Sequence, residues 1–224
     1  MRVNDRKGSL LLNGASVLLL GVGFGLRHAL DVDHVVVVST LLQRDRSAWR
    51  AACIAASWGA GHTAAFLGLG LLIVQLGVQL PESFEPIAQL LVAIMLVYLG
   101  LRQVLQAGVR QERDAPAPTP LRPAAAVARP LLVGVVHGFA GSAGIALVAA
   151  STMSSPLLAS LYLGVFCLGT IVGMVLLTVL LSRALAWAEH RRGQLGGTVA
   201  SAGAWLSIAL GVTILVSVAI GGSS

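Results

Sequence analysis

Residues 9–42 read SLLLNGASVLLLGVGFGLRHALDVDHVVVVSTLL, an apolar stretch interrupted once, by the charged octet RHALDVDH at residues 27–34. A helix needs about 20 predominantly apolar residues to cross the hydrocarbon core of a bilayer. The run at residues 9–26 approaches that length, and the piece at about 28–42 is shorter. This stretch therefore predicts a membrane protein with ionisable groups inside the membrane.

The rest of the chain has the composition of a membrane protein. Of 224 residues, 56% are hydrophobic and 11% are charged, and the mean hydropathy is +0.87. A globular domain has about 25% charged residues. We therefore predict an all-α integral membrane protein, and not a disordered chain, a nucleic-acid-binding module or an ordinary soluble enzyme. Further apolar runs occupy residues 52–77, 86–107, 131–152, 157–182 and 197–220.

The charges between the apolar runs predict the orientation. The charged side chains of residues 80–86 are both acidic, Glu82 and Glu85. Arginines, in contrast, are concentrated in residues 43–50, 102–130 and 183–192. The positive-inside rule places those three basic segments in the cytoplasm, and the basic N-terminus also favours that side. Both conditions hold only if residues 9–42 cross the membrane twice, which gives seven transmembrane helices. The alternative is six helices, with residues 9–42 as one long bent helix.

The chain is predicted to form a single membrane domain over residues 1–224. Its first helical half is residues 9–107, and its second is residues 131–224. Between them, residues 108–130 are rich in proline, alanine and arginine, which is typical of an exposed, stiffened linker, here on the cytoplasmic side.

A faint internal echo relates the two halves. Residues 21–40 end in VVVVST, and residues 133–152 end in LVAAST. In the seven-helix topology the echoing helices run in opposite directions. The echo therefore indicates a 3+3 inverted repeat after one extra helix, an arrangement known in secondary transporters. Low-complexity apolar sequence can also imitate such an echo.

The octet cannot form one regular helix that aims all its ionisable groups at one point. At 100° per residue, Arg27, His28, Asp31 and His34 fall within an arc of about 120°. Asp33 lies roughly 100° outside that arc. Either the helix is unwound here, which membranes allow where the backbone is buried in protein or lines a cavity, or Asp33 serves a different face.

Two imidazoles and two carboxylates within seven residues predict a site for a divalent transition metal. Nitrogen and oxygen ligands suit Ni²⁺, Co²⁺, Zn²⁺ and Mn²⁺. The alternative is a buried ion-pair network, Arg27 with Asp31 or Asp33, that only fixes helix packing.

Two further histidines lie in apolar runs, whereas His190 lies in a basic segment. His62 is part of SWGAGHT, and His137 opens HGFAGSAG. Small residues at such spacing are also what plain helix packing uses, so a packing role is the alternative for both histidines. The predicted metal ligands are His28, Asp31, Asp33, His34, His62 and His137.

The octet closely resembles the signature of the nickel/cobalt transporter superfamily, a histidine, four residues and then Asp-His. The signature positions correspond to Arg27, His28, Asp31, Asp33 and His34. GAGHT, with His62, is similar to the second pattern of that superfamily. HGFAGSAG resembles the second-half pattern of the shorter, urease-accessory-like branch. The acidic second-half motif of the longer permeases is missing, and the histidine-rich loop of the efflux branch is missing from residues 108–130.

The resemblance implies a secondary transporter that takes up Ni²⁺ or Co²⁺ across the cytoplasmic (inner) membrane, with the N-terminus in the cytoplasm. Efflux on the same fold is the alternative. Asp31 and Arg27 would orient the imidazoles and balance charge. The metal would be held by His28, Asp33, His34 and His62, with His137 completing the set.

Other classes fit the sequence less well. A metallohydrolase would need a motif such as HExxH, which is absent, and a haem carrier would leave Asp31 and Asp33 unexplained. Cys53 and Cys167 form no CxxC motif. We expect no enzyme activity, no resident cofactor and no nucleic-acid partner. The expected partners are the bilayer and the transported ion. Because the GxxxxGK[ST] P-loop is absent, any energising or metallochaperone partner would be a separate protein.

Overall fold

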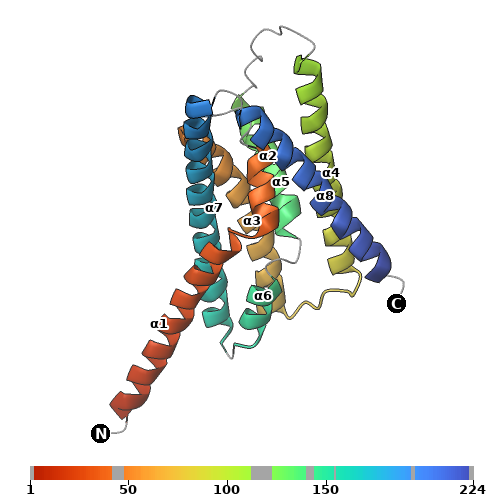
Figure 1. The fold of residues 1–224 in the computed structure, drawn as a ribbon. Coiled ribbons are helices and arrows are strands. Elements are labelled where there is room, and N and C mark those ends of the chain that lie inside the picture. The colour runs from red at the N-terminus through yellow and green to blue at the C-terminus, as the bar shows by residue number, and fades with distance from the viewer. Residues whose placement is uncertain are drawn as a thin grey trace.

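The computed structural model describes residues 3–41, 48–111, 123–139, 144–153, 155–192 and 195–221. Within these ranges the chain forms helices and no strand, so the predicted all-α membrane class is confirmed (Figure 1). The helices are α1 (Val3–His28), α2 (Val32–Leu41), α3 (Ala48–Leu76), α4 (Phe84–Gln111), α5 (Pro123–Gly138), α6 (Gly144–Ser151), α7 (Pro156–Arg192) and α8 (Leu195–Gly221).

The octet is unwound, as one of the two sequence interpretations requires. Helix α1 ends at His28, and α2 starts at Val32 with a bend of 54° between the two helices. A tight turn joins them, in which the amide of Leu30 donates to the carbonyl of Arg27 at 2.9 Å and that of Asp31 to the carbonyl of His28 at 3.0 Å. The break lets neighbouring residues of the octet point in directions that a continuous helix forbids.

The predicted count of seven transmembrane helices is not confirmed. Four helical stretches in the described chain are long and apolar enough to span a membrane, and the bent α1–α2 pair would make a fifth. The pair lies end to end in Figure 1, which matches the alternative of one bent helix over residues 9–42. The N-terminus lies at the opposite end of the bundle from the ends of α4 and α7, which carry basic segments. The helix count of seven and the orientation of the N-terminus therefore stay predictions.

Two predicted boundaries are wrong. The run at residues 131–152 is not one helix, because α5 ends at Gly138 and α6 begins at Gly144. Glycine lowers helix propensity by about 1 kcal/mol, and HGFAGSAG is rich in it. The predicted linker 108–130 is also too long. Helix α4 continues to Gln111 and α5 starts at Pro123, a residue favoured at a first helical position. Residues 112–122 lie outside the described residues.

Close helix crossings at glycines hold the bundle together. Helix α1 packs against α7, and α3 packs against both α5 and α7. A Cβ atom on Gly25 of α1 would collide with the backbone of Phe166 on α7. One on Gly134 of α5 would collide with the carbonyl of Trp58 on α3. Small residues give membrane helices this close approach, which replaces the hydrophobic driving force missing in lipid.

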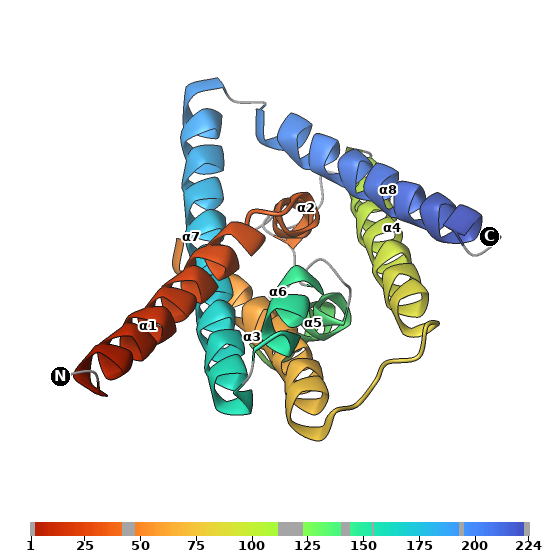
Figure 2. The ribbon, with the colours of Figure 1, turned by 90° about the horizontal axis from the view of Figure 1, so that it is seen from below.

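Helix α4 packs against α8, and α2 lies between this pair and α7. Figure 2 shows α2 nearly end-on in that position. The buried valines 36–38 of α2 pack in a cluster with Trp58 and Met174, while a second buried cluster contains Phe66 and Phe166. The charged turn therefore sits beside the packed interior, where solvent is excluded.

The two halves of the chain share an architectural feature. In each half, a helix that ends at or next to a histidine is followed by a short helix and then by a long one: α1, α2 and α3, and then α5, α6 and α7. If α1 corresponds to α5 and α3 to α7, the packing of α1 against α7 corresponds to the packing of α5 against α3. This pattern agrees with the predicted inverted repeat and with the division into two halves, and both stay predictions.

Candidate metal site

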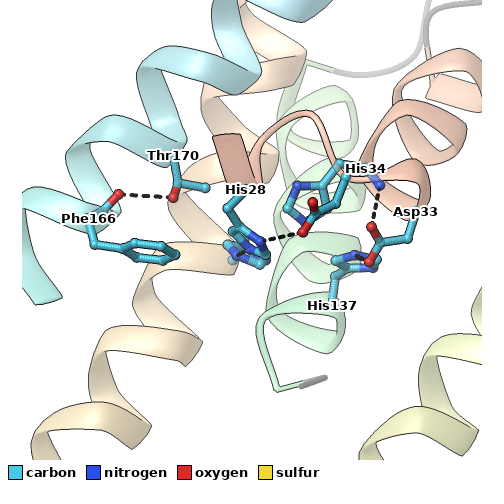
Figure 3. A network of polar contacts seen from close by, with 8 residues as sticks. His28, Asp33, His34, His137, Phe166 and Thr170 are labelled. Atoms are coloured by element: carbon cyan, nitrogen blue, oxygen red, sulfur yellow. Dashed lines mark hydrogen bonds and ion pairs between the residues drawn. The ribbon is translucent and has the colours of Figure 1, made fainter. Parts of the chain in front are cut away.

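Four histidines from four helices meet at the break between α1 and α2, and Figure 3 labels three of them, His28, His34 and His137. His28 ends α1, His34 lies on α2, His62 on α3 and His137 on α5, and all four side chains are buried. The centroids of their contacting rings lie between 4.5 and 5.9 Å apart. The structure thus brings together the four histidines that the sequence places in apolar runs.

His28 and His62 form the first close pair of ligand atoms. Their Nε2 atoms lie 3.3 Å apart. A metal–nitrogen bond of about 2.0–2.1 Å places two adjacent imidazole nitrogens on one ion about 3.0–3.4 Å apart. The observed separation therefore equals the spacing of two ligands of a single ion.

Asp31 orients that pair. Its Oδ2 lies 2.8 Å from His28 Nδ1, which leaves Nε2 of the same ring free to face His62. A carboxylate on the outer nitrogen of a metal-binding histidine fixes the ring and raises its basicity. The Asp31 side chain is 40% exposed and is not among the atoms that converge on the buried site.

Asp33 and His137 form the second close pair. Oδ2 of Asp33 lies 2.9 Å from Nε2 of His137, and Oδ1 accepts the backbone amide of His34 at 3.0 Å. Figure 3 shows the Asp33 carboxylate between the start of α2 and α5. Because the break turns α2 away from α1, Asp33 reaches α5 while His34 reaches the other histidines.

His34 lies between the two pairs. Its ring centroid is 4.5 Å from that of His28 and 4.9 Å from that of His137. The residue is 0% exposed, and neither ring nitrogen has a hydrogen-bond partner among the described residues. A buried polar atom without a partner costs about 1–3 kcal/mol. This unsatisfied ring is typical of a ligand-binding site rather than of packing alone.

The converging atoms form two groups that could hold a cation. His28, His34 and His62 make one group, and Asp33, His34 and His137 make the other. Within each group the ligand atoms lie within 4.8 Å of one another. Arg27 is exposed, and the contacts of Asp31 and Asp33 described above are with histidines. The arrangement therefore does not resemble the alternative network of Arg27 with the two carboxylates.

Sequence reasoning missed Trp58. It is 0% exposed, and its ring lies edge-on to His34 with centroids 5.2 Å apart. Trp58 precedes His62 by one helical turn, and that i,i+4 spacing could have placed both on one face of α3. Trp58 therefore forms a wall of the site.

The two cysteines lie apart from this chemistry. Both are free; Cys53 of α3 is exposed and Cys167 of α7 is buried. Cys167 packs with Phe66 and Phe166 in an apolar cluster. The described structure gives neither thiol a place among the converging ligand atoms.

Comparisons with known proteins identify the family of the chain. A family model described as the cytochrome C biogenesis protein transmembrane region matches residues 34–213. A urease accessory protein, UreH of Bacillus sp. (strain TB-90), is 31% identical over 173 residues, which cover 74% of this chain and 76% of that protein. No solved structure matches. The resemblance to the urease-accessory-like branch is confirmed, and the chain belongs to the cytochrome C biogenesis protein transmembrane region family as a relative of the urease accessory protein UreH.

Proposed function

We propose that this chain is a secondary transporter of Ni²⁺ or Co²⁺ that takes the ion up into the cytoplasm. The observation that carries the proposal is the 3.3 Å separation of His28 Nε2 and His62 Nε2, with the unsatisfied His34 beside them. Imidazole nitrogens with a carboxylate suit divalent metals of this kind. The relationship to a urease accessory protein supports nickel in particular.

Burial of the site favours transport over catalysis. Ionisable groups at membrane depth are costly and usually mark an ion pathway or a proton relay. The cluster lies at the bend between α1 and α2, and discontinuous helices form the ion sites of many secondary transporters. We therefore assign the protein no enzymatic role and no resident cofactor, and the metal is its substrate.

The membrane potential would supply the driving force. Moving one positive charge inward along 100 mV releases about 2.3 kcal/mol, so a divalent ion gains about 4.6 kcal/mol. Energy of that size corresponds to an accumulation of more than about a thousandfold at equilibrium. A location in the cytoplasmic membrane follows from this mechanism, and no nucleotide-driven partner is required for it.

The test is accumulation of ⁶³Ni²⁺ in cells that express the chain. Three forms are compared at equal membrane abundance: the wild type, His34→Ala, and His190→Ala as a matched histidine control. Uptake predicts accumulation in the wild type and the control and none in His34→Ala. Lower accumulation than in empty cells, again dependent on His34, would reverse the direction to efflux. Equal accumulation in all three forms would refute the site.

A further inference from the structure

The two ligand groups at the helix break share one residue. His34 belongs both to the group with His28 and His62 and to the group with Asp33 and His137. It is also the histidine with no partner on either ring nitrogen among the described residues. A ring in this position can turn from one neighbouring group to the other and present the same nitrogen to each.

We propose that these groups are two successive positions for the transported cation, and that His34 hands the cation from one position to the other. The proposal rests on the transport function proposed above and adds an intermediate step to it. The cation occupies one position at a time, because both positions need His34 and two divalent ions at such close range repel each other strongly.

The spacing of the atoms favours two positions over one large one. The His28–His62 pair has the 3.3 Å separation of adjacent ligands on one ion, and the Asp33–His137 pair is a hydrogen-bonded pair at 2.9 Å that a cation could divide. Ring contacts of 4.5 to 5.1 Å join His34 to both pairs, whereas the contact between His62 and His137 is longer, at 5.9 Å. Three ligands suffice at each position, and His34 completes both.

The two positions differ in chemistry. The first consists of three imidazoles, and the second consists of two imidazoles and the Asp33 carboxylate. A cation that moves between them exchanges its outer ligands but keeps His34 throughout. It is therefore never left without ligands in a region where a bare charge would be very costly.

The test uses the purified full-length chain in detergent and titrates it with Co²⁺, whose visible spectrum reports its ligands. His62→Ala removes a ligand only from the first position, and His137→Ala removes one only from the second. We expect each variant to bind one Co²⁺ per chain with its own distinct spectrum. The wild-type spectrum should be a weighted sum of the two. His34→Ala should bind Co²⁺ more than about a hundredfold more weakly, and His190→Ala should behave as the wild type.

The possible outcomes separate the two-position handover from the proposed transport function. Identical spectra for His62→Ala and His137→Ala, or two Co²⁺ ions bound together in the wild type, would overturn the handover while leaving a metal transporter in place. Absence of Co²⁺ and Ni²⁺ binding in the wild type would overturn the proposed function itself. His62→Gln and His137→Gln, which preserve side-chain volume better, repeat the comparison if an alanine variant elutes as an aggregate.

Discussion

Nε2 of His28 and Nε2 of His62 lie 3.3 Å apart, although 34 residues separate them in the chain. His28 is the last residue of α1, and His62 lies inside α3. The two nitrogens are within hydrogen-bond distance of each other, and their separation also matches the ligand spacing of a single cation. The relationship depends on the turn after His28, which ends α1 at the depth of His62.

Asp31 acts as a positioning residue for His28. Asp31→Ala removes the acceptor for His28 Nδ1, so we expect Ni²⁺ affinity to fall by about ten- to a hundredfold. Asp31→Asn keeps a carbonyl oxygen there and should lose less. Equilibrium dialysis of purified protein against Ni²⁺ measures both, with exposed Glu82→Ala as the control. Equal affinities for Asp31→Ala and the wild type would remove this role.

Trp58 should report the arrival of the metal. It is buried against His34, whereas Trp49, Trp187 and Trp205 are exposed. Bound Ni²⁺ should therefore quench mainly the fluorescence of Trp58. We expect Trp58→Phe to retain Ni²⁺ binding by dialysis and to lose most of the quenching. Quenching of the same amplitude in Trp58→Phe would mean that the metal binds elsewhere.

Gly134 should be essential to the α3–α5 crossing. A Cβ there would collide with the carbonyl oxygen of Trp58. We expect Gly134→Ala to destabilise the fold by about 1–3 kcal/mol, or more if the helices cannot shift. The matched control is Gly23→Ala, since a Cβ at Gly23 has no atom within 4 Å and alanine favours a helix. Melting temperatures from fluorescence-detected size exclusion give the comparison, and equal melting temperatures would contradict the close packing.

The thiols should be dispensable, whatever the family description suggests about cytochrome biogenesis. Cys53 is exposed and Cys167 lies in an apolar cluster away from the histidines. We expect Cys53→Ala and Cys167→Ala, alone or combined, to accumulate ⁶³Ni²⁺ within about twofold of the wild type, because neither sulfur is a ligand. Loss of accumulation in the folded double variant would point to thiol chemistry instead.

The orientation can be tested at two exposed positions. Glu82 lies in the acidic connection between α3 and α4, and Arg183 lies in the last part of α7, which carries a basic segment. In the cysteine-free background, Glu82→Cys should react with an impermeant maleimide in intact cells, and Arg183→Cys only after permeabilisation. The reverse pattern would invert the topology, and with it the proposed direction of uptake.

Sequence reasoning goes far for local features of this protein. The octet contains His28, Asp33 and His34. Its helical geometry allows two interpretations, and the structure has the first of them, an unwound helix. His62 and His137 are identifiable because histidine is costly in an apolar run.

Tertiary relationships lie beyond that reasoning. The division of residues 131–152 into α5 and α6 does not follow from hydropathy, which measures the length of an apolar run but not the continuity of its helix. The pairing of Asp33 with His137, and the place of Trp58 beside His34, depend on how glycines bring α3 and α5 together. Loop charges alone do not show whether the α1–α2 pair, bent by 54°, crosses the membrane once or twice.

The most direct test of the central claim is uptake of ⁶³Ni²⁺ by liposomes that contain only the purified chain. A potassium gradient with valinomycin makes the interior negative, which should drive Ni²⁺ inward through the wild type and through His190→Ala. His34→Ala and His34→Phe, the second of which fills the space of the imidazole, should be as inactive as empty liposomes. Potential-driven accumulation that requires His34 is the predicted result. Wild-type liposomes no different from empty ones, or His34 variants as active as the wild type, would contradict the account.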